Sequence, residues 1–305
     1  MALIPRIVAG TARLGSVLPE PLARRSRRQA ELRTLDALLD AGCTAFDLAA
    51  SYQLGGTERL FGQWIASRRN RARLFLVGKG GHPYPAVRPN RLTRPALEAD
   101  LHASLRRLGV EQLDLYLLHR DVPGAPLEPM LEALQTAHAA GKISAWGVSN
   151  WTIPRIEAIS AVARSAGIVP MAASSPHLSV AAWVRPPWPG SVSIAGPAQA
   201  AARAFHTRTQ LPVLAWSPLA SGFLSSGRGG GSVYQGASNL ARRERVRALA
   251  RERGFTAAQV ALAYCLSQPF PVSVVVAVST PEKMRENLQA PSIHLSAEEI
   301  RALEE

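Results

Sequence analysis

The sequence predicts an α/β fold, a single-domain (β/α)8 TIM barrel that takes up residues 1–305. Eight short apolar runs alternate with helical patterns, and strands that are apolar on both faces are typical of a parallel sheet covered by helices. A length of 305 residues suits one such barrel. An open doubly wound sheet is the structural alternative, although the G-x-G-x-x-G turn that accompanies it is missing.

The expected strands share a richness in β-branched residues. They are, in chain order, Ile7 to Gly10, Cys43 to Asp47, Leu74 to Lys79, Leu113 to His119, Ile143 to Val148, Ile168 to Ala173, Pro212 to Trp216 and Val272 to Val278. Because the strands of such a barrel all end on one face, we expect residues at their carboxyl ends to converge.

Helix signals fill the intervals between the strands. The clearest expected helix is capped by Thr93, closed by Gly109 and marked on one face by Leu97, Leu101, Leu105 and Leu108. Gly42 and Gly141 follow two other helical patterns just before strands. Two later helices begin with capping-box spacing, Thr256 with Gln259 and Ser296 with Glu299.

Two segments depart from the alternation. Residues 181–197 carry prolines and two tryptophans and are expected to form an ordered loop, whereas residues 224–236 are rich in glycine and serine and are expected to be mobile. Each segment has two interpretations. It either shapes a ligand pocket, the first as a wall and the second as a lid, or is a plain surface insertion.

Composition limits the classes of function. Hydrophobic residues make up 47% of the chain and charged residues 19%, as in soluble globular proteins. The net charge of +13 would suit a phosphate-bearing partner, but the arginines are dispersed and no basic platform with aromatic residues accompanies them. We therefore expect a solvated basic face and no nucleic-acid partner.

Other sequence features bear on membrane association, disulfides, metal binding and cellular compartment. No run approaches the roughly 20 apolar residues that a membrane span needs, so no membrane association is expected. Cys43 and Cys265 lack neighbours at ligand spacing, so no disulfide framework and no metal site are expected. The amino-terminal residues lack a secretory pattern, which makes the cytoplasm the expected compartment.

Four residue types suggest a proton-donating site: Asp47, Tyr52, Lys79 and His119. Three of them lie at or just beyond the carboxyl end of an expected strand, so they can converge on one substrate atom. Lys79 stands out because the chain otherwise draws its positive charge from arginine, apart from Lys142 and Lys283. Unlike a guanidinium, an ammonium can sit beside a phenol and exchange a proton. The alternative is that Lys79 is present by chance in an arginine-rich chain and has no special role.

The four side chains together can protonate a carbonyl oxygen while a hydride reaches its carbon. A tyrosine ordinarily titrates near pH 10, so Lys79 is expected to make the phenolate of Tyr52 more accessible, and Asp47 to keep the lysine charged. His119 is expected to donate a hydrogen bond to the same oxygen.

Two other kinds of chemistry could use the same residues. The triplet His119, Arg120 and Asp121 spells a kinase motif, but the asparagine and D-F-G that kinases need are missing. Lys79 could instead be the Schiff-base nucleophile of an aldolase, although Asp47 beside it would hold the amine protonated. The remaining histidines are expected to be structural, with His177 alone positioned to face a pocket.

The segment "GCTAFDLAASYQLGGTERLFG", from Gly42 to Gly62, resembles the signature of the aldo-keto reductase superfamily. The resemblance implies a catalytic tetrad of Asp47, Tyr52, Lys79 and His119. "GVSNW" is similar to the family segment that binds the nicotinamide amide, which implies Ser149 and Asn150. "AWSPLASG" looks like the segment that stacks on nicotinamide through Trp216 and wraps the pyrophosphate with Ser217, Leu219 and Ser221.

The resemblance continues to the end of the chain. "STPEKMRENL" is similar to the family's adenosine-binding helix, which implies that Lys283 faces the 2′-phosphate and that Glu286 and Asn287 contact the adenine. The sequence departs from the family near Ser174, where a glutamine is usual, so either Ser174 or Ser175 is expected to replace it. It departs again at Ala277 and Val278, which leaves Lys283, helped by Arg285, as the cation for the phosphate.

The predicted function is therefore the reduction of an aldehyde or ketone, a small-molecule carbonyl substrate, by NADP(H), with NAD(H) as the alternative cofactor. A cofactor-binding regulatory or redox-sensing subunit with little turnover is the rival function. Arg13, Tyr84 and Trp151 are the expected substrate-pocket residues, with Trp183 and Trp188 as further candidates. The sequence predicts neither the substrate nor the oligomeric state.

Overall fold

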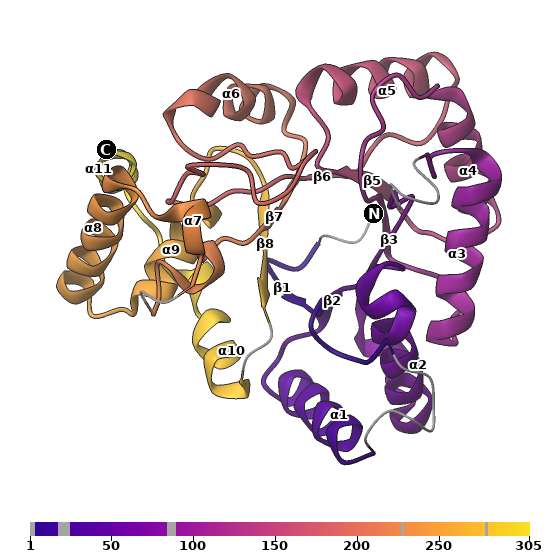
Figure 1. The fold of residues 1–305 in the computed structure, drawn as a ribbon, viewed down its shortest axis with the longest axis horizontal. Helices are drawn as coiled ribbons and strands as arrows, with labels where there is room; N and C mark the ends of the chain where they lie inside the picture. Colours follow the sequence, from indigo (N-terminus) through magenta and orange to yellow (C-terminus); the bar gives the residue numbers. More distant parts are fainter. Residues whose placement is uncertain (1–3, 18–24, 84–89, 227–228, 278–279) are drawn as a thin grey trace. The chain divides into compact units, whose positions relative to one another are not determined.

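The structure is a computed structural model, and it describes residues 4–17, 25–83, 90–226, 229–277 and 280–305. Within these residues the strands form a closed barrel in the order β1 to β8, and all the strand pairings that can be assigned are parallel. Figure 1 labels the strands and helices along the chain. The predicted (β/α)8 fold is confirmed.

The strands contain three to six residues each, at the short end of the usual range. They are β1 (Ile7–Gly10), β2 (Ala45–Asp47), β3 (Phe75–Gly80), β4 (Leu115–Leu118), β5 (Trp146–Ser149), β6 (Ala173–Ser175), β7 (Val213–Trp216) and β8 (Val272–Ala277).

Helices follow the strands along the chain. The α-helices are α1 (Arg25–Asp40), α2 (Gly56–Arg68), α3 (Arg94–Leu108), α4 (Glu128–Ala139), α5 (Ile153–Ser165), α6 (Ala200–Thr209), α7 (Gly231–Tyr234), α8 (Ala237–Arg253), α9 (Ala257–Leu266), α10 (Pro281–Asn287) and α11 (Ala297–Glu304). Short 3-10 turns are η1 (Tyr52–Gly55), η2 (Arg71–Arg73), η3 (Pro197–Gln199), η4 (Ala220–Gly222) and η5 (Ala290–Ser292). No helix of the described part is long and apolar enough to cross a membrane.

The chain forms two compact units. The first contains residues 1–5 and 9–173, with β2 to β5 and α1 to α5, and the second contains residues 6–8 and 174–305, with β7, β8 and α6 to α11. That residues 1–305 behave as a single domain stays a prediction.

An aromatic cluster forms part of the core of the first unit. The Phe46 ring of β2 lies edge-on to the Phe61 and Trp64 rings of α2, with centroid separations of 5.3 and 5.5 Å. Edge-to-face geometry is favourable because the positive ring edge meets the negative face of its neighbour. The indole Nε1 of Trp64 donates to Asp36 of α1 at 2.7 Å, so α1, α2 and β2 are held together. This packing fixes the strand that ends in Asp47.

The helix-end signals proved largely right. Gly42, Gly109 and Gly141 all have positive φ, as expected where a helix gives way to a strand. Both predicted capping boxes form, at Thr256 and at Ser296. Thr93 does occupy the N-cap position of α3 with an extended backbone, but its side chain makes no capping hydrogen bond.

Several predicted boundaries were wrong. Cys43 precedes β2, because its amide bonds the Leu38 carbonyl at the end of α1. The sixth strand is Ala173–Ser175 rather than Ile168 to Ala173, since Pro170 has no N–H to give to a ladder. The predicted end of the eighth strand, Val278, lies outside the described residues. The segment expected to be a mobile loop contains the short helix α7.

Candidate active site

Four polar side chains meet at strand ends of the first unit. Asp47 is the last residue of β2, Lys79 is next to last in β3, and His119 directly follows β4. Tyr52 opens the 3-10 turn η1, five residues after Asp47. The strand register aligns Lys79 with Leu117 and Gly80 with Leu118, which brings the ends of β3 and β4 together.

Asp47, Lys79 and Tyr52 form a closed triangle of contacts. The Lys79 Nζ lies 2.5 Å from Asp47 Oδ1 and donates to the Tyr52 hydroxyl at 3.1 Å. The Tyr52 hydroxyl donates to Asp47 Oδ2 at 3.2 Å. Lys79 also donates to the Leu48 carbonyl at 3.1 Å, so two hydrogen bonds and one ion pair hold its ammonium. The ammonium is thus held in one orientation beside the phenol.

Burial and charge set the protonation of the triangle. Lys79 and Asp47 are each only 4% exposed. Burial by itself would lower the pKa of Lys79, but the charge of Asp47 and the hydrogen-bonding contacts with Asp47 and Tyr52 outweigh it, so the pKa is raised above 10.5. A protonated amine is not a nucleophile, so the contacts argue against Schiff-base chemistry at Lys79.

Lys79 acts on the pKa of Tyr52 in the expected direction, but it is not the largest influence. Burial raises the pKa of Tyr52 above 10.0, the carboxylate of Asp47 raises it further, and the ammonium of Lys79 lowers it only in part. Lys79 therefore lowers the pKa of Tyr52 as expected, although burial and the Asp47 carboxylate outweigh it. In this state Tyr52 is a protonated phenol at neutral pH, which is the form that a general acid needs.

His119 is a neutral hydrogen-bonding group. Burial lowers its pKa well below 6.5, and the positive charge of Lys79 lowers it further. Its Nδ1 lies 3.4 Å from the Ser51 hydroxyl, and its ring is edge-on to Tyr52 with centroids 5.8 Å apart. If Ser51 donates to Nδ1, the single proton of the neutral ring is on Nε2.

Most non-glycine residues with a left-handed backbone conformation lie in the segments that the sequence assigned to catalysis or cofactor binding. Of the eight such residues in the described part of the chain, Arg69 and Gln210 are helix C-caps. The other six are Gln53, Leu54, Asn150, Ser217, Ala220 and Ser221. A residue in this conformation costs about 1–3 kcal/mol, and such residues are found mainly at active sites and ligand-binding segments.

The proposed nicotinamide contacts lie in two separate segments. Ser149 and Asn150 are both buried, and the Asn150 amide donates to the Ser149 hydroxyl at 3.0 Å. In β6 the Ser175 hydroxyl donates to the Leu214 carbonyl at 2.8 Å, whereas the Ser174 side chain makes no hydrogen bond within the described residues. Of the two serines left open by the sequence, Ser174 is the one with an uncommitted hydroxyl.

Trp216 lies in an aromatic cluster of the second unit. The Trp188 ring stacks on it at 5.4 Å and 19°, and Trp183 and His177 lie against it at 5.5 and 5.2 Å. The nitrogen of its indole is buried without a partner in the described part of the chain. Since Trp188 covers one face of Trp216, a nicotinamide ring has to use the other face or displace Trp188.

The adenosine-contact candidates are on α10. Lys283 is exposed and no carboxylate of the described residues pairs with it, whereas Arg285 is paired with Glu282 at 3.7 Å. Glu286 accepts a hydrogen bond from Thr256, and Asn287 is buried. Glu286 therefore already has a structural role at the start of α9.

The substrate-pocket candidates have different environments. Arg13 is exposed, and Tyr84 lies outside the described residues. Trp151 is buried, with the Arg155 guanidinium 5.1 Å above its ring. In the part of the chain that the structure describes, no group of three or more metal-binding side chains forms.

Comparison with known proteins places the chain in a family. A family model described as the aldo/keto reductase family matches residues 6–305. The chain belongs to this family. An oxidoreductase of Mycobacterium tuberculosis is 31% identical over 280 residues, which cover 86% of this chain and 77% of that protein.

Two further proteins similar to this chain differ in what their names state. A crystal structure of an aldo/keto reductase from Klebsiella pneumoniae, in complex with NADP and acetate, has a TM-score of 0.75 and 29% identity, covering 98% of this chain and 90% of that one. A candidate voltage-gated potassium channel subunit beta of Schizosaccharomyces pombe is 25% identical over 280 residues, covering 82% of this chain and 76% of that protein.

Sequence reasoning missed several residues around the tetrad of this aldo/keto reductase. Ser51 contacts His119, and the His82 ring lies 4.9 Å from the His119 ring, although His82 was expected to be merely structural. Arg120 adds positive charge that helps to lower the pKa of His119. Their positions just beyond strand ends were the available signal, since His82 is only three residues after Lys79.

His177 does not fit its predicted pocket-facing position. It is fully buried, its Nδ1 contacts Ser193 at 2.8 Å, its Nε2 contacts the Tyr234 hydroxyl at 3.0 Å, and its ring stacks on Trp183. It thereby connects residues 181–197 to α7. Burial lowers the pKa of His177 to about 3.

This buried histidine predicts acid sensitivity. Unfolded histidine binds a proton below pH 6.5 but folded His177 does not until about pH 3, so its contribution to stability is present above pH 6.5 and is lost as the pH falls. Between pH 7 and 5 it should remove about 2 kcal/mol of unfolding free energy. Urea unfolding at both pH values measures this. His177→Gln should shrink the difference and exposed His294→Gln should not, whereas equal differences in all three proteins would contradict the prediction.

Proposed function

We propose that this protein reduces an aldehyde or ketone to an alcohol with NADPH, and that Tyr52 is the general acid. The observation that carries the proposal is the buried triangle of Asp47, Lys79 and Tyr52, with Lys79 donating to the phenol at 3.1 Å. A protonated phenol held against an ammonium can release its proton to an oxyanion as the ammonium stabilises the phenolate that remains.

The chain's own residues handle the proton. A carbonyl oxygen within reach of the Tyr52 hydroxyl takes its proton, and Lys79 compensates the charge left on the phenolate. Asp47 keeps Lys79 charged and oriented through the 2.5 Å contact. Neutral His119, with its proton on Nε2, donates a hydrogen bond to the same oxygen and so aligns the carbonyl. Bound NADPH would supply the hydride for the carbonyl carbon.

The residues of the second unit suit a phosphate-bearing cofactor. The segment Ser217 to Ser221 combines hydroxyls with left-handed backbone, which can turn amide N–H groups toward phosphate oxygens. Lys283 is an exposed cation without a carboxylate partner in the described residues. We therefore propose that Ser217, Leu219 and Ser221 contact the pyrophosphate and that Lys283 binds the 2′-phosphate.

The remaining cofactor contacts follow from the family resemblance. Trp216 would stack on the nicotinamide, and Ser149, Asn150 and Ser174 would bind its amide. Glu286 and Asn287 would contact the adenine. The Klebsiella relative crystallised with NADP supports the choice of cofactor.

Lys283 tests the cofactor preference. Lys283→Met should weaken NADPH binding about tenfold, since one charge-assisted contact to phosphate is lost, and should leave NADH binding unchanged. Titrating both dinucleotides by fluorescence measures the ratio. Exposed Arg301→Met is the matched control, because it removes a cation from a different helix. Equal weakening of NADH and NADPH would show that Lys283 does not read the 2′-phosphate.

The reductase activity itself is tested by a panel of aldehydes and ketones, with the loss of NADPH absorbance as the readout. Turnover of one class of carbonyl compound supports the proposal. The absence of turnover across the panel, combined with tight NADPH binding, would instead favour the second candidate function.

That second candidate is a nicotinamide-binding regulatory subunit with little turnover. The similarity to a candidate channel subunit beta favours it, because that relative covers 82% of this chain. The triangle of Asp47, Lys79 and Tyr52 favours the enzyme, since a purely regulatory protein gains nothing from burying a charged amine against a phenol at a desolvation cost.

A further inference from the structure

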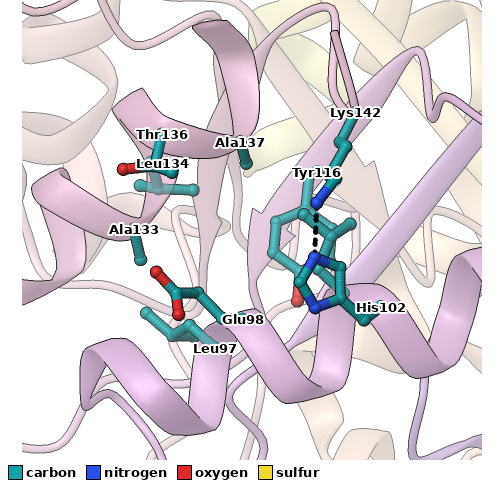
Figure 2. A pocket seen from close by; sticks show the side chains of 10 residues that line it. Leu97, Glu98, His102, Tyr116, Ala133, Leu134, Thr136, Ala137 and Lys142 are labelled. Atoms are coloured by element: carbon teal, nitrogen blue, oxygen red, sulfur yellow. Dashed lines mark hydrogen bonds between the residues drawn. The ribbon is translucent and has the colours of Figure 1, made fainter. Parts of the chain in front are cut away.

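A small cavity lies between α3 and α4 in the first unit, beside β4 (Figure 2). Its volume is about 160 Å³, and most of its wall is apolar. Leu97 and Leu101 of α3, Leu134 of α4 and the ring of Tyr116 provide that wall. None of its lining residues belongs to the proposed active site. We call it the α3–α4 cavity.

Two basic side chains meet at the edge of the α3–α4 cavity. The Lys142 Nζ lies 2.6 Å from His102 Nε2, as the dashed line in Figure 2 shows. An ammonium only donates, so the imidazole nitrogen accepts and the histidine is neutral. Lys142 keeps further N–H groups that bond no acceptor within the described residues. Lys142 is one of three lysines in the chain, so this amine is an unusual choice for its composition.

The charge of this ammonium is not neutralised by the cavity itself. No carboxylate of the described residues forms an ion pair with Lys142, and Glu98, which also lines the cavity, is paired with Arg94 at 2.8 Å. Lys142 and His102 are both only partly exposed. A half-buried cation beside an apolar wall favours a ligand that brings an anion on an apolar body.

The volume of the cavity limits the size of the apolar part of the ligand. An apolar protein cavity of about 150 Å³ holds one benzene ring. The α3–α4 cavity, at about 160 Å³, is therefore matched to a single ring or a short branched chain, with the charged group at the lysine. A nucleotide or a sugar phosphate is too large and too polar for these walls.

We propose that the α3–α4 cavity binds a small aromatic carboxylate, with the ring against Leu97, Leu101 and Leu134 and the carboxylate bonded to Lys142 Nζ. His102 positions the ammonium and leaves its other N–H groups for the ligand. The site is separate from the tetrad, so it does not depend on the proposed reductase function.

Calorimetric titration of the whole protein tests the site with three probes of one shape and different charge. Benzoate should bind, neutral benzamide should bind about tenfold more weakly, and cationic benzylamine should not bind, because only the anion gains the charge-assisted contact. Lys142→Met should weaken benzoate about tenfold and leave benzamide unchanged. Arg106→Met removes an exposed cation from α3 outside the cavity and should change neither probe.

A second variant separates this cavity from any other site that accepts benzoate. Ala137→Leu puts a larger side chain into the cavity wall and should abolish the Lys142-dependent part of benzoate binding. Binding of benzoate at any other site should persist in both the Lys142→Met and the Ala137→Leu variant. Circular dichroism of each variant verifies folding, and Lys142→Met carries the test if Ala137→Leu does not fold. The proposal is overturned by unchanged benzoate affinity in Lys142→Met, by equal affinity for all three probes, or by no binding below about 10 mM benzoate.

Discussion

Replacing Tyr52 by phenylalanine is expected to lower the turnover of a carbonyl substrate by about 10²–10⁴-fold, the usual contribution of a general acid. The ring and its packing against His119 remain, and so does the ion pair of Asp47 and Lys79. The change removes the hydroxyl, with its transferable proton and its hydrogen bonds to Lys79 and Asp47. NADPH binding should be unchanged, because the hydroxyl acts on the substrate oxygen. Stopped-flow turnover and an NADPH titration on the same sample measure both quantities.

Tyr264→Phe is the matched control for this experiment. It removes a hydroxyl that donates to Glu304 of α11 at 2.6 Å, which has no part in the proposed chemistry, so turnover should stay within about twofold. Turnover retained by Tyr52→Phe would remove Tyr52 from the mechanism. The pH profile adds a second check. Since the pKa of Tyr52 is raised above 10.0, the wild-type rate should not fall between pH 7 and 9 through loss of this proton.

Replacing Lys79 by methionine is expected to destabilise the protein as well as inactivate it. The change leaves the Asp47 carboxylate buried and unpaired, which typically costs about 3–5 kcal/mol of unfolding free energy. Chemical denaturation at pH 7 measures the loss. Lys283→Met, which removes an exposed lysine, should cost less than about 0.5 kcal/mol and is the matched control.

The double variant Asp47→Leu with Lys79→Met separates stability from catalysis. Removing both charges should restore most of the stability, because apolar residues can replace a buried ion pair at little cost. Turnover should stay lost, since the phenolate of Tyr52 would no longer be compensated. A double variant as unstable as Lys79→Met alone would mean that packing of the lysine chain, rather than its charge, stabilises the strand ends.

Local signals predicted much of the fold. The alternation of apolar runs and helical patterns depends on neighbouring residues, and so do capping boxes such as the one at Thr256. Those features were therefore accessible to reasoning from sequence. The wrong sixth strand shows the limit, since pairing of Ser174 with Pro212 and with Val213 of β7, rather than local β propensity, determines where β6 lies.

Electrostatic and long-range features of the site were less accessible. The net direction of the Tyr52 pKa depends on how deeply the phenol is buried and how near Asp47 lies, and neither quantity is a property of the sequence pattern. The contact of Lys142 with His102 joins residues 40 positions apart in the sequence. Likewise, the stacking of Trp188 on Trp216 covers the ring that sequence reasoning had reserved for a cofactor.

By itself, the sequence determined the barrel class, the family and the order in which Asp47, Tyr52, Lys79 and His119 follow the strands, because these depend on residue type and local spacing. Only the tertiary structure decided that Lys79 contacts Tyr52 and Asp47 at once, that His119 is neutral, and that the Lys142 ammonium lies beside an apolar cavity between α3 and α4. Such properties arise from burial and from distances between residues far apart in the chain, and both exist only after folding.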